Sequence, residues 1–152
     1  MANFLLPLIK DIGGAYQLQN VGNGRLVADA VIPAFEPAAR RKGLLGRDSL
    51  AEGSAMVLAP TNAIHTFWMR FAIDVLFVRR NGTVVKVARN VPPWRAVVGL
   101  RAYAVIELPS GALRPGDVAV GDVLALMPAA VSEFEEPAIA SEFEEPLMAR
   151  VS

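Results

Sequence analysis

The sequence predicts an all-β domain, an antiparallel jelly-roll-like sandwich or barrel of about seven or eight short strands with one short helix. Three observations support this fold class. Short β-branched and apolar runs recur along the chain, and glycine and proline separate them at regular intervals. No long amphipathic helices alternate with these runs, so a doubly wound α/β sheet is excluded.

The first half of the chain contains two expected strands and the expected helix. Residues 24–32, GRLVADAVI, predict a strand that Pro33 ends. The following EPAARRKGLL fits one or two helical turns, with Pro37 near the start and Gly43 near the stop. AMVLA, residues 55–59, predicts a short buried strand that is closed by a proline.

The second half is richer in turn signals. Asn81-Gly82 between DVLFV and TVVKV predicts a β-hairpin, because both central residues of a type I′ turn need positive φ. NVPPW predicts a loop, since proline donates no backbone hydrogen bond. RAYAVIEL predicts a strand and PSGALRPGD a turn-rich connection. VAVGDVLAL predicts the last one or two strands, with Gly121-Asp122 as a turn.

Charge is distributed unevenly along the 152 residues. Residues 132–152 carry six glutamates and one arginine, which leaves residues 1–131 with 14 basic and 9 acidic groups, a net charge of +5. We therefore divide the chain into a lead-in (1–20), a β-domain (21–128) and an acidic tail (129–152) that is expected to be disordered. The tail either confers solubility or docks on a basic surface of this chain or of a neighbour.

The hexapeptide SEFEEP occurs twice in the tail, at 132–137 and 141–146. One interpretation is an accidental duplication in a disordered segment. The other is a short linear motif in two copies, with Phe134 and Phe143 as anchors for a partner.

Composition excludes several classes of function. The chain has no cysteine, which excludes disulfides, thiolate metal sites and a cysteine nucleophile. No apolar run approaches about 20 residues, and NFLLPLI lacks the basic region of a signal peptide. We therefore expect no membrane span and a cytoplasmic location, although a mature exported chain would look similar. We expect no cofactor, and no nucleic-acid-binding signature is present.

The segment HTFWMRFAIDVLF, residues 65–77, is the most informative stretch. On an unbroken strand Arg70 and Asp74 would share a face with Trp68, whereas a bulge or turn at Phe71-Ala72 would reverse the second half. Four residues span about 13 Å on a strand, so no direct bridge between the two charges is expected within one straight strand.

Each ionisable residue of this stretch has a structural and a functional interpretation. Asp74 lies among apolar neighbours, so it either accepts hydrogen bonds from backbone amides or Arg70, or serves a site. His65 alone is a poor metal site, because zinc needs three or four ligands. Asp74 and Glu107 could form a carboxylate pair of the glycosidase type. Trp94, after the double proline, either stacks on a ligand or packs on the rim.

Several segments together resemble the DUF192 family, whose function is unassigned. HTFWMRFAIDVLF is the most specific of them, and GLLGR and ELPSG support it; the resemblance covers about residues 25–126. The family often has a cysteine after the proline that precedes the histidine segment, where this chain has Thr61, and often a proline at Ala72. The resemblance implies an all-β, jelly-roll-like domain without established catalytic residues. It makes His65, Arg70, Asp74 and Glu107 candidate pocket residues.

Three functional hypotheses follow. The first is a non-enzymatic β-domain that binds a small polar or anionic ligand or a protein partner, with Trp68, Arg70, Asp74 and Glu107 lining the pocket and His65 at its edge. The second is a scaffold that acts through the duplicated tail. The third is a glycan-directed hydrolase that uses Asp74 and Glu107, which requires both carboxyls about 5 to 9.5 Å apart in one cleft. The oligomeric state stays open.

Overall fold

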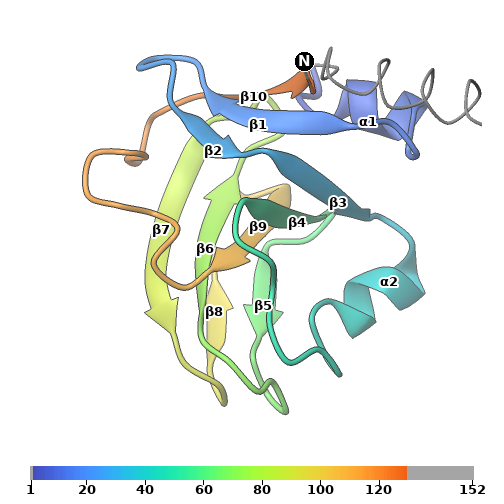
Figure 1. Cartoon of the computed structure of the whole chain (residues 1–152), viewed down its shortest axis with the longest axis vertical. Helices are drawn as coiled ribbons and strands as arrows, with labels where there is room; N and C mark the ends of the chain where they lie inside the picture. The colour runs from blue at the N-terminus through green and yellow to red at the C-terminus, as the bar shows by residue number, and fades with distance from the viewer. Residues whose placement is uncertain (1, 130–152) are drawn as a thin grey trace, which may run out of the picture.

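The computed structural model describes residues 2–129, which form ten strands in three sheets and two short helices (Figure 1). The largest sheet has the order β3-β4-β9-β6-β7 and contains Ala30–Ala34, Ser54–Leu58, Ala104–Pro109, Ile73–Val78 and Val84–Val91. A second sheet has the order β10-β1-β2 and contains Leu124–Pro128, Tyr16–Asn20 and Leu26–Ala28. The third pairs β5 (Ala63–His65) with β8 (Ala96–Val98). The helices are α1 (Leu6–Lys10) and α2 (Pro37–Lys42).

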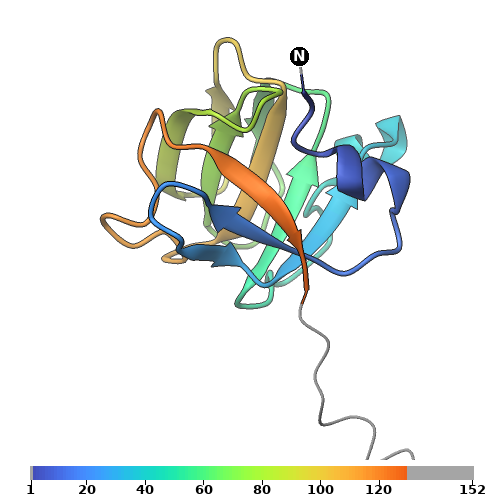
Figure 2. The same cartoon turned by 90° about the horizontal axis from the view of Figure 1, so that it is seen from above.

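The five-stranded sheet is buried on both faces. On one face, α1 and the three-stranded sheet pack against it through a core that includes Leu8, Leu18 and Ile106 (Figures 1 and 2). On the other face, the loop after α2 and the strand pair β5-β8 cover it through a second core that includes Leu44 and Phe77. Strand β9 lies in the middle of this sheet, so its side chains alternate between the two cores.

The mostly β architecture with few short helices is confirmed, and several details of the prediction are corrected. The three sheets do not close into a barrel, and a jelly-roll order is not confirmed. The pair β3-β4 is parallel, so the fold is not wholly antiparallel. The strand expected at residues 24–32 is divided at Asp29 into β2 and β3, which belong to different sheets. Strand β3 continues through Pro33 because it lies at a sheet edge, where a missing N–H is tolerated.

Two local predictions are confirmed because short-range chemistry decides them. Helix α2 begins at Pro37 and ends at Lys42, just before Gly43, which has a φ of 46° and donates its N–H to the carbonyl of Ala39. The hairpin between β6 and β7 also forms, but its turn type was wrong. Only Gly82 has positive φ, 95°, and its N–H bonds to Arg79 at 2.9 Å, which is a type I turn followed by a left-handed glycine.

The structure adds elements that the sequence signals did not indicate. The lead-in contributes α1 and β1, and both place leucines in the first core. Strand β8 has only three residues. The last strand is limited to β10, after the turn at Gly121, whose φ is 96°. The SEFEEP copies with Phe134 and Phe143 lie outside the described residues. Neither helix within residues 2–129 has the length and apolar character needed to cross a membrane.

Candidate functional site

The segment 65–77 is divided between two strands rather than forming one. His65 ends β5, residues 66–72 form a connecting loop, and β6 begins at Ile73. The interpretation with a turn near Phe71-Ala72 therefore holds, and the alternation expected for one strand does not apply. This arrangement separates Arg70, in the loop, from Asp74, in the sheet.

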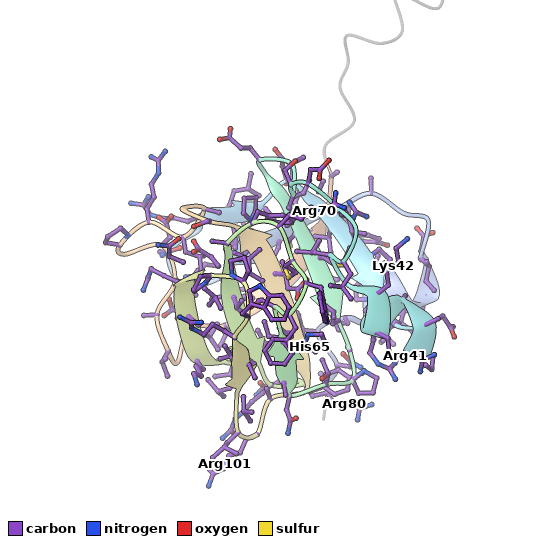
Figure 3. The ribbon with its side chains drawn as sticks, turned by 90° about the horizontal axis from the view of Figure 1, so that it is seen from below. Arg41, Lys42, His65, Arg70, Arg80 and Arg101 are labelled. Atoms are coloured by element: carbon purple, nitrogen blue, oxygen red, sulfur yellow. The ribbon has the colours of Figure 1, made fainter. Side chains whose placement is uncertain are left out.

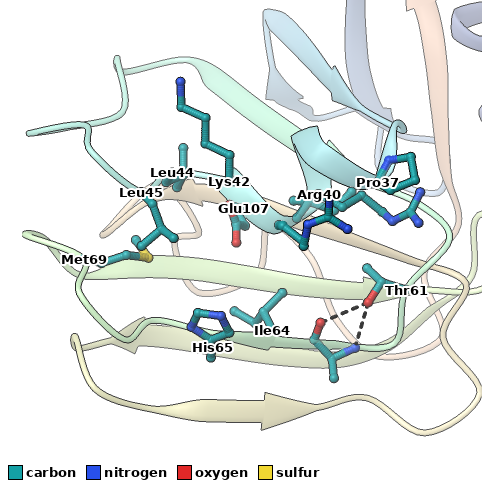
Figure 4. Close-up of a pocket in the computed structure, with 14 residues that line it drawn as sticks. Pro37, Arg40, Lys42, Leu44, Leu45, Thr61, Ile64, His65, Met69 and Glu107 are labelled. Atoms are coloured by element: carbon teal, nitrogen blue, oxygen red, sulfur yellow. Dashed lines mark hydrogen bonds between the residues drawn. The ribbon is translucent and has the colours of Figure 1, made fainter.

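A pocket with a volume of about 280 Å³ lies between the end of α2, β5 and β9 (Figure 4). Polar and apolar groups contribute about equally to its walls. The apolar side chains come from the loop after α2, from β4 and β5 and from the loop after β5: Leu44, Leu45, Leu58, Ile64 and Met69. Glu107 of β9 and His65 of β5 also line it, and Figure 4 shows their side chains on opposite sides of the space. The pocket thus combines apolar side chains with one acidic and several basic groups.

Glu107 supplies the polar group deepest in this pocket. Its cross-strand neighbours are Met56 and Val75, so the carboxyl emerges on the face of the second core. The residue is only 3% exposed, and its Oε2 is buried without a hydrogen-bond partner among residues 2–129. Burial raises the pKa of this carboxyl from 4.5 to about 7, because desolvation penalises the charged form. The group is therefore a hydrogen-bond donor below neutral pH and an unpaired anion above it.

Every other ionisable side chain that lines the pocket is basic. The last turn of α2 contributes Arg40, Arg41 and Lys42, and β5 contributes His65. The guanidinium of Arg40 already has hydrogen-bond partners within this chain, because its Nη1 donates to the carbonyls of Phe35 and Ala59. Arg41 and Lys42 carry their charge beside the pocket, so an anion near its mouth is favoured electrostatically.

Asp74 lies on the opposite face of the same sheet from Glu107. In the β6-β9 register Asp74 is paired with Leu108 and Val75 with Glu107, so the two carboxyls point to different cores. Asp74 accepts hydrogen bonds from the backbone N–H groups of Asn90 (2.7 Å), Gly111 (3.1 Å) and Leu113 (3.0 Å). The backbone-amide interpretation thus describes its contacts, and the two carboxyls do not meet in one cleft as a glycosidase pair requires.

Arg70 and Trp68 lie outside the pocket lining. The Nη1 of Arg70 bonds to Asp48 at 2.6 Å, but its side chain is 62% exposed, so the pair is a surface salt bridge. Trp68 is 73% exposed and has a φ of 68°, a left-handed conformation that is rare for a bulky residue. Of the five candidate pocket residues, the structure brings together His65 and Glu107.

Trp68 belongs to a separate cluster of exposed rings, which we term the aromatic patch: Phe67, Trp68 and Trp94. The rings of Trp68 and Trp94 meet edge to face with centroids 4.7 Å apart, and Phe67 lies 6.0 Å from Trp94. His65 stacks on Phe67 at 5.1 Å, which connects this patch to the pocket wall. Trp94 also has positive φ, 69°.

Thr66 holds the two loops of the aromatic patch together. Its side chain is fully buried. The hydroxyl donates to the carbonyl of Pro92 (2.7 Å) and accepts the N–H of Arg95 (2.9 Å). Its carbonyl accepts the N–H of Trp94 at 3.0 Å. The positions of both tryptophans therefore depend on one threonine.

Replacing Thr66 with valine is expected to lower the free energy of unfolding by about 1 kcal/mol or more, because the Pro92 carbonyl and the Arg95 N–H lose their partner on a buried hydroxyl while the side-chain shape is kept. Urea denaturation measures this change. Thr66→Ser retains the hydroxyl and is the matched control, with a smaller loss. A valine variant as stable as the wild type would contradict the role of the hydroxyl.

Sequence reasoning missed Thr66 and the α2 contribution to the pocket. A threonine beside aromatic residues carries no signal of its own, because its partners come from a loop about 30 residues later. GLLGR was used only to support the family resemblance, although Gly43, Leu44 and Leu45 line the pocket. Thr61, at the position of the family's frequent cysteine, lines it as well and donates to the carbonyl of Ala63 at 3.0 Å.

The fold and pocket define a small, mostly β domain in which a central sheet carries a buried carboxyl beneath a basic helix end. The DUF192 family model, described as an uncharacterized ACR, matches residues 19–126, and the chain belongs to this family. GLLGR, HTFWM and ELPSG, three stretches that carry the resemblance, contribute Leu44, His65 and Glu107 to the same pocket.

Two solved structures are similar to this chain. One is a Sinorhizobium meliloti protein provisionally described as a transcription regulator, with 23% identity and a TM-score of 0.64 over 74% of this chain and 92% of that one. The other is a protein of unknown function from Novosphingobium aromaticivorans, with 19% identity and a TM-score of 0.62 over 72% and 82%. Both likenesses concern the fold alone. No curated protein matches the sequence.

Proposed function

We propose that this domain binds a small ligand that carries an anionic group and a short apolar part, and that the pocket around Glu107 and His65 is its site. The observation that carries this proposal is the buried Oε2 of Glu107, which has no partner among residues 2–129 although it lines a pocket of about 280 Å³. A buried polar atom without a hydrogen-bond partner lowers the stability of the fold. Such an atom is expected where a bound ligand supplies the missing hydrogen bond.

The charges around the pocket favour an anion over a cation. Arg41, Lys42 and His65 line the same pocket, and Glu107 is the single acidic residue that lines it. With its pKa raised to about 7, protonated Glu107 donates a hydrogen bond to a carboxylate-like acceptor. The apolar side chains then cover the remainder of the ligand.

Hexanoate, hexanamide and hexylamine form a probe series that has one apolar chain and three head groups. We expect wild-type protein to bind hexanoate most tightly in calorimetric titration. Its affinity falls by up to about tenfold for each pH unit above 7, because deprotonated Glu107 repels the anion. Preference for hexylamine, or no binding of any probe, would contradict the proposal.

Two variants of Glu107 provide the controls. Glu107→Gln keeps a hydrogen-bond donor and removes the titration, so it should bind hexanoate with little dependence on pH. Glu107→Leu removes the polar group and should lose the binding. Arg70→Met lies outside the pocket lining and should bind as the wild type does.

A further inference from the structure

The aromatic patch contains exposed apolar surface that the pocket does not use. Phe67, Trp68 and Trp94 are 38%, 73% and 54% exposed, and they lie side by side in two loops. Both tryptophans have positive φ, a strained backbone conformation for bulky residues. An exposed group of large aromatic rings that the buried Thr66 holds in place is typical of a contact surface preorganised for a partner.

The exposed cations next to the aromatic patch are Arg70 and Arg95. Arg95 follows Trp94 directly, and Arg70 lies two residues after Trp68 and is paired with the exposed Asp48. Figure 3 shows His65 near the middle of this face, with Arg70, Arg41 and Lys42 around it. A partner that fits must bring aromatic side chains and negative charge together.

The chain itself contains such a segment twice. In each SEFEEP copy a phenylalanine, Phe134 or Phe143, has one glutamate before it and two after it. We propose that the aromatic patch of one molecule binds the SEFEEP segment of a second copy of this chain. The phenylalanine packs on the tryptophan rings, and a glutamate of the segment pairs with Arg95.

Chain reach favours a second copy over the same molecule. Figure 1 shows β10, after which the tail begins, at the end of the domain away from the loops that follow β5 and β7. Five residues from Ala129 to Phe134 extend at most about 18 Å. A domain of this length is about 36 Å across. The first motif therefore cannot reach the patch of its own chain, whereas the second, which extends at most about 50 Å from Ala129, can. Only contacts with a neighbour allow both motifs to bind and raise avidity.

Intrinsic fluorescence tests this proposal directly, because Trp68 and Trp94 are the chain's two tryptophans and both lie in the patch. We expect emission of the full chain to shift to the blue as protein concentration rises. Quenching by acrylamide should fall by about twofold over the same range, since association follows mass action. The double variant Phe134→Ala, Phe143→Ala should stay red-shifted at every concentration. Ile139→Ala, between the two motifs, is the matched control and should behave as the wild type.

A synthetic SEFEEP peptide added to the double variant should restore the blue shift, and a SEAEEP peptide should not. About 0.5 M salt and the variant Arg95→Gln should each weaken the effect severalfold, because both reduce the attraction between arginine and glutamate. Equal emission of the wild type and the double variant would overturn the proposal. So would tryptophan shielding in the wild type that is independent of concentration, since that result assigns the contact to a single molecule.

Discussion

Replacing Asp74 with asparagine is expected to lower the free energy of unfolding by about 3 kcal/mol or more. The buried carboxylate accepts three backbone N–H groups, from Asn90, Gly111 and Leu113. An asparagine side chain has one acceptor oxygen and turns its NH₂ group toward donors, so at least one buried N–H loses its partner. These donors come from β7 and from the loop after β9, so the loss loosens both against β6. Urea denaturation monitored by circular dichroism measures the difference.

Arg70→Met is the matched control for this experiment, since the sequence offered Arg70 as a partner of Asp74. Its bridge to Asp48 is exposed on both sides, so its removal should change stability by less than about 1 kcal/mol. Equal losses in the two variants would indicate that the charges act together. A stable Asp74→Asn variant would show that the three backbone bonds contribute little.

Glu107→Gln is expected to act in the opposite direction and to stabilise the protein at alkaline pH. The carboxyl has a pKa of 4.5 when solvated and about 7 when buried, so the folded state binds more protons between these values. The stability of the wild type therefore falls as the pH rises from about 4.5 to above 7. A shift of about 2.5 units corresponds to about 3 kcal/mol at pH values above 8.

Urea denaturation at about pH 4 and about pH 8.5 measures this difference. Glutamine is neutral at both, so the variant should exceed the wild type by about 3 kcal/mol at the higher pH and match it closely at the lower. A gain of equal size at both pH values would contradict the titration, because it would reflect packing. A gain at high pH would also show that the carboxyl is retained at a cost to folding, as functional groups often are.

Local signals predicted the fold best. Pro37 and Gly43 marked α2, and Asn81-Gly82 marked the hairpin, because each depends on backbone chemistry within a few residues. The parallel pairing of β3 with β4 could not be predicted in this way, since it depends on the chain crossing over between them. Asp29 divides two strands of different sheets without glycine or proline at the break.

The candidate site was predicted only in part, because its residues are brought together by contacts between distant parts of the sequence. His65 and Glu107 were both named as candidate pocket residues, and the pocket joins them across 42 positions of sequence. Whether Asp74 and Glu107 share a face depends on the pairing register of β6 with β9, and a shift of one residue reverses the answer. The basic end of α2 entered the pocket only once the helix was placed in three dimensions.

The edges of the five-stranded sheet influence how copies of this chain can associate. Pro33 in the edge strand β3 lacks an N–H. Strand β7, at the other edge, pairs with β6 with two register shifts and carries the exposed Lys86 and Arg89. Such features hinder the addition of a foreign strand, the first step of edge-to-edge aggregation and amyloid growth. The sheet is thus protected against open-ended extension through its backbone, so any association between copies has to use side chains.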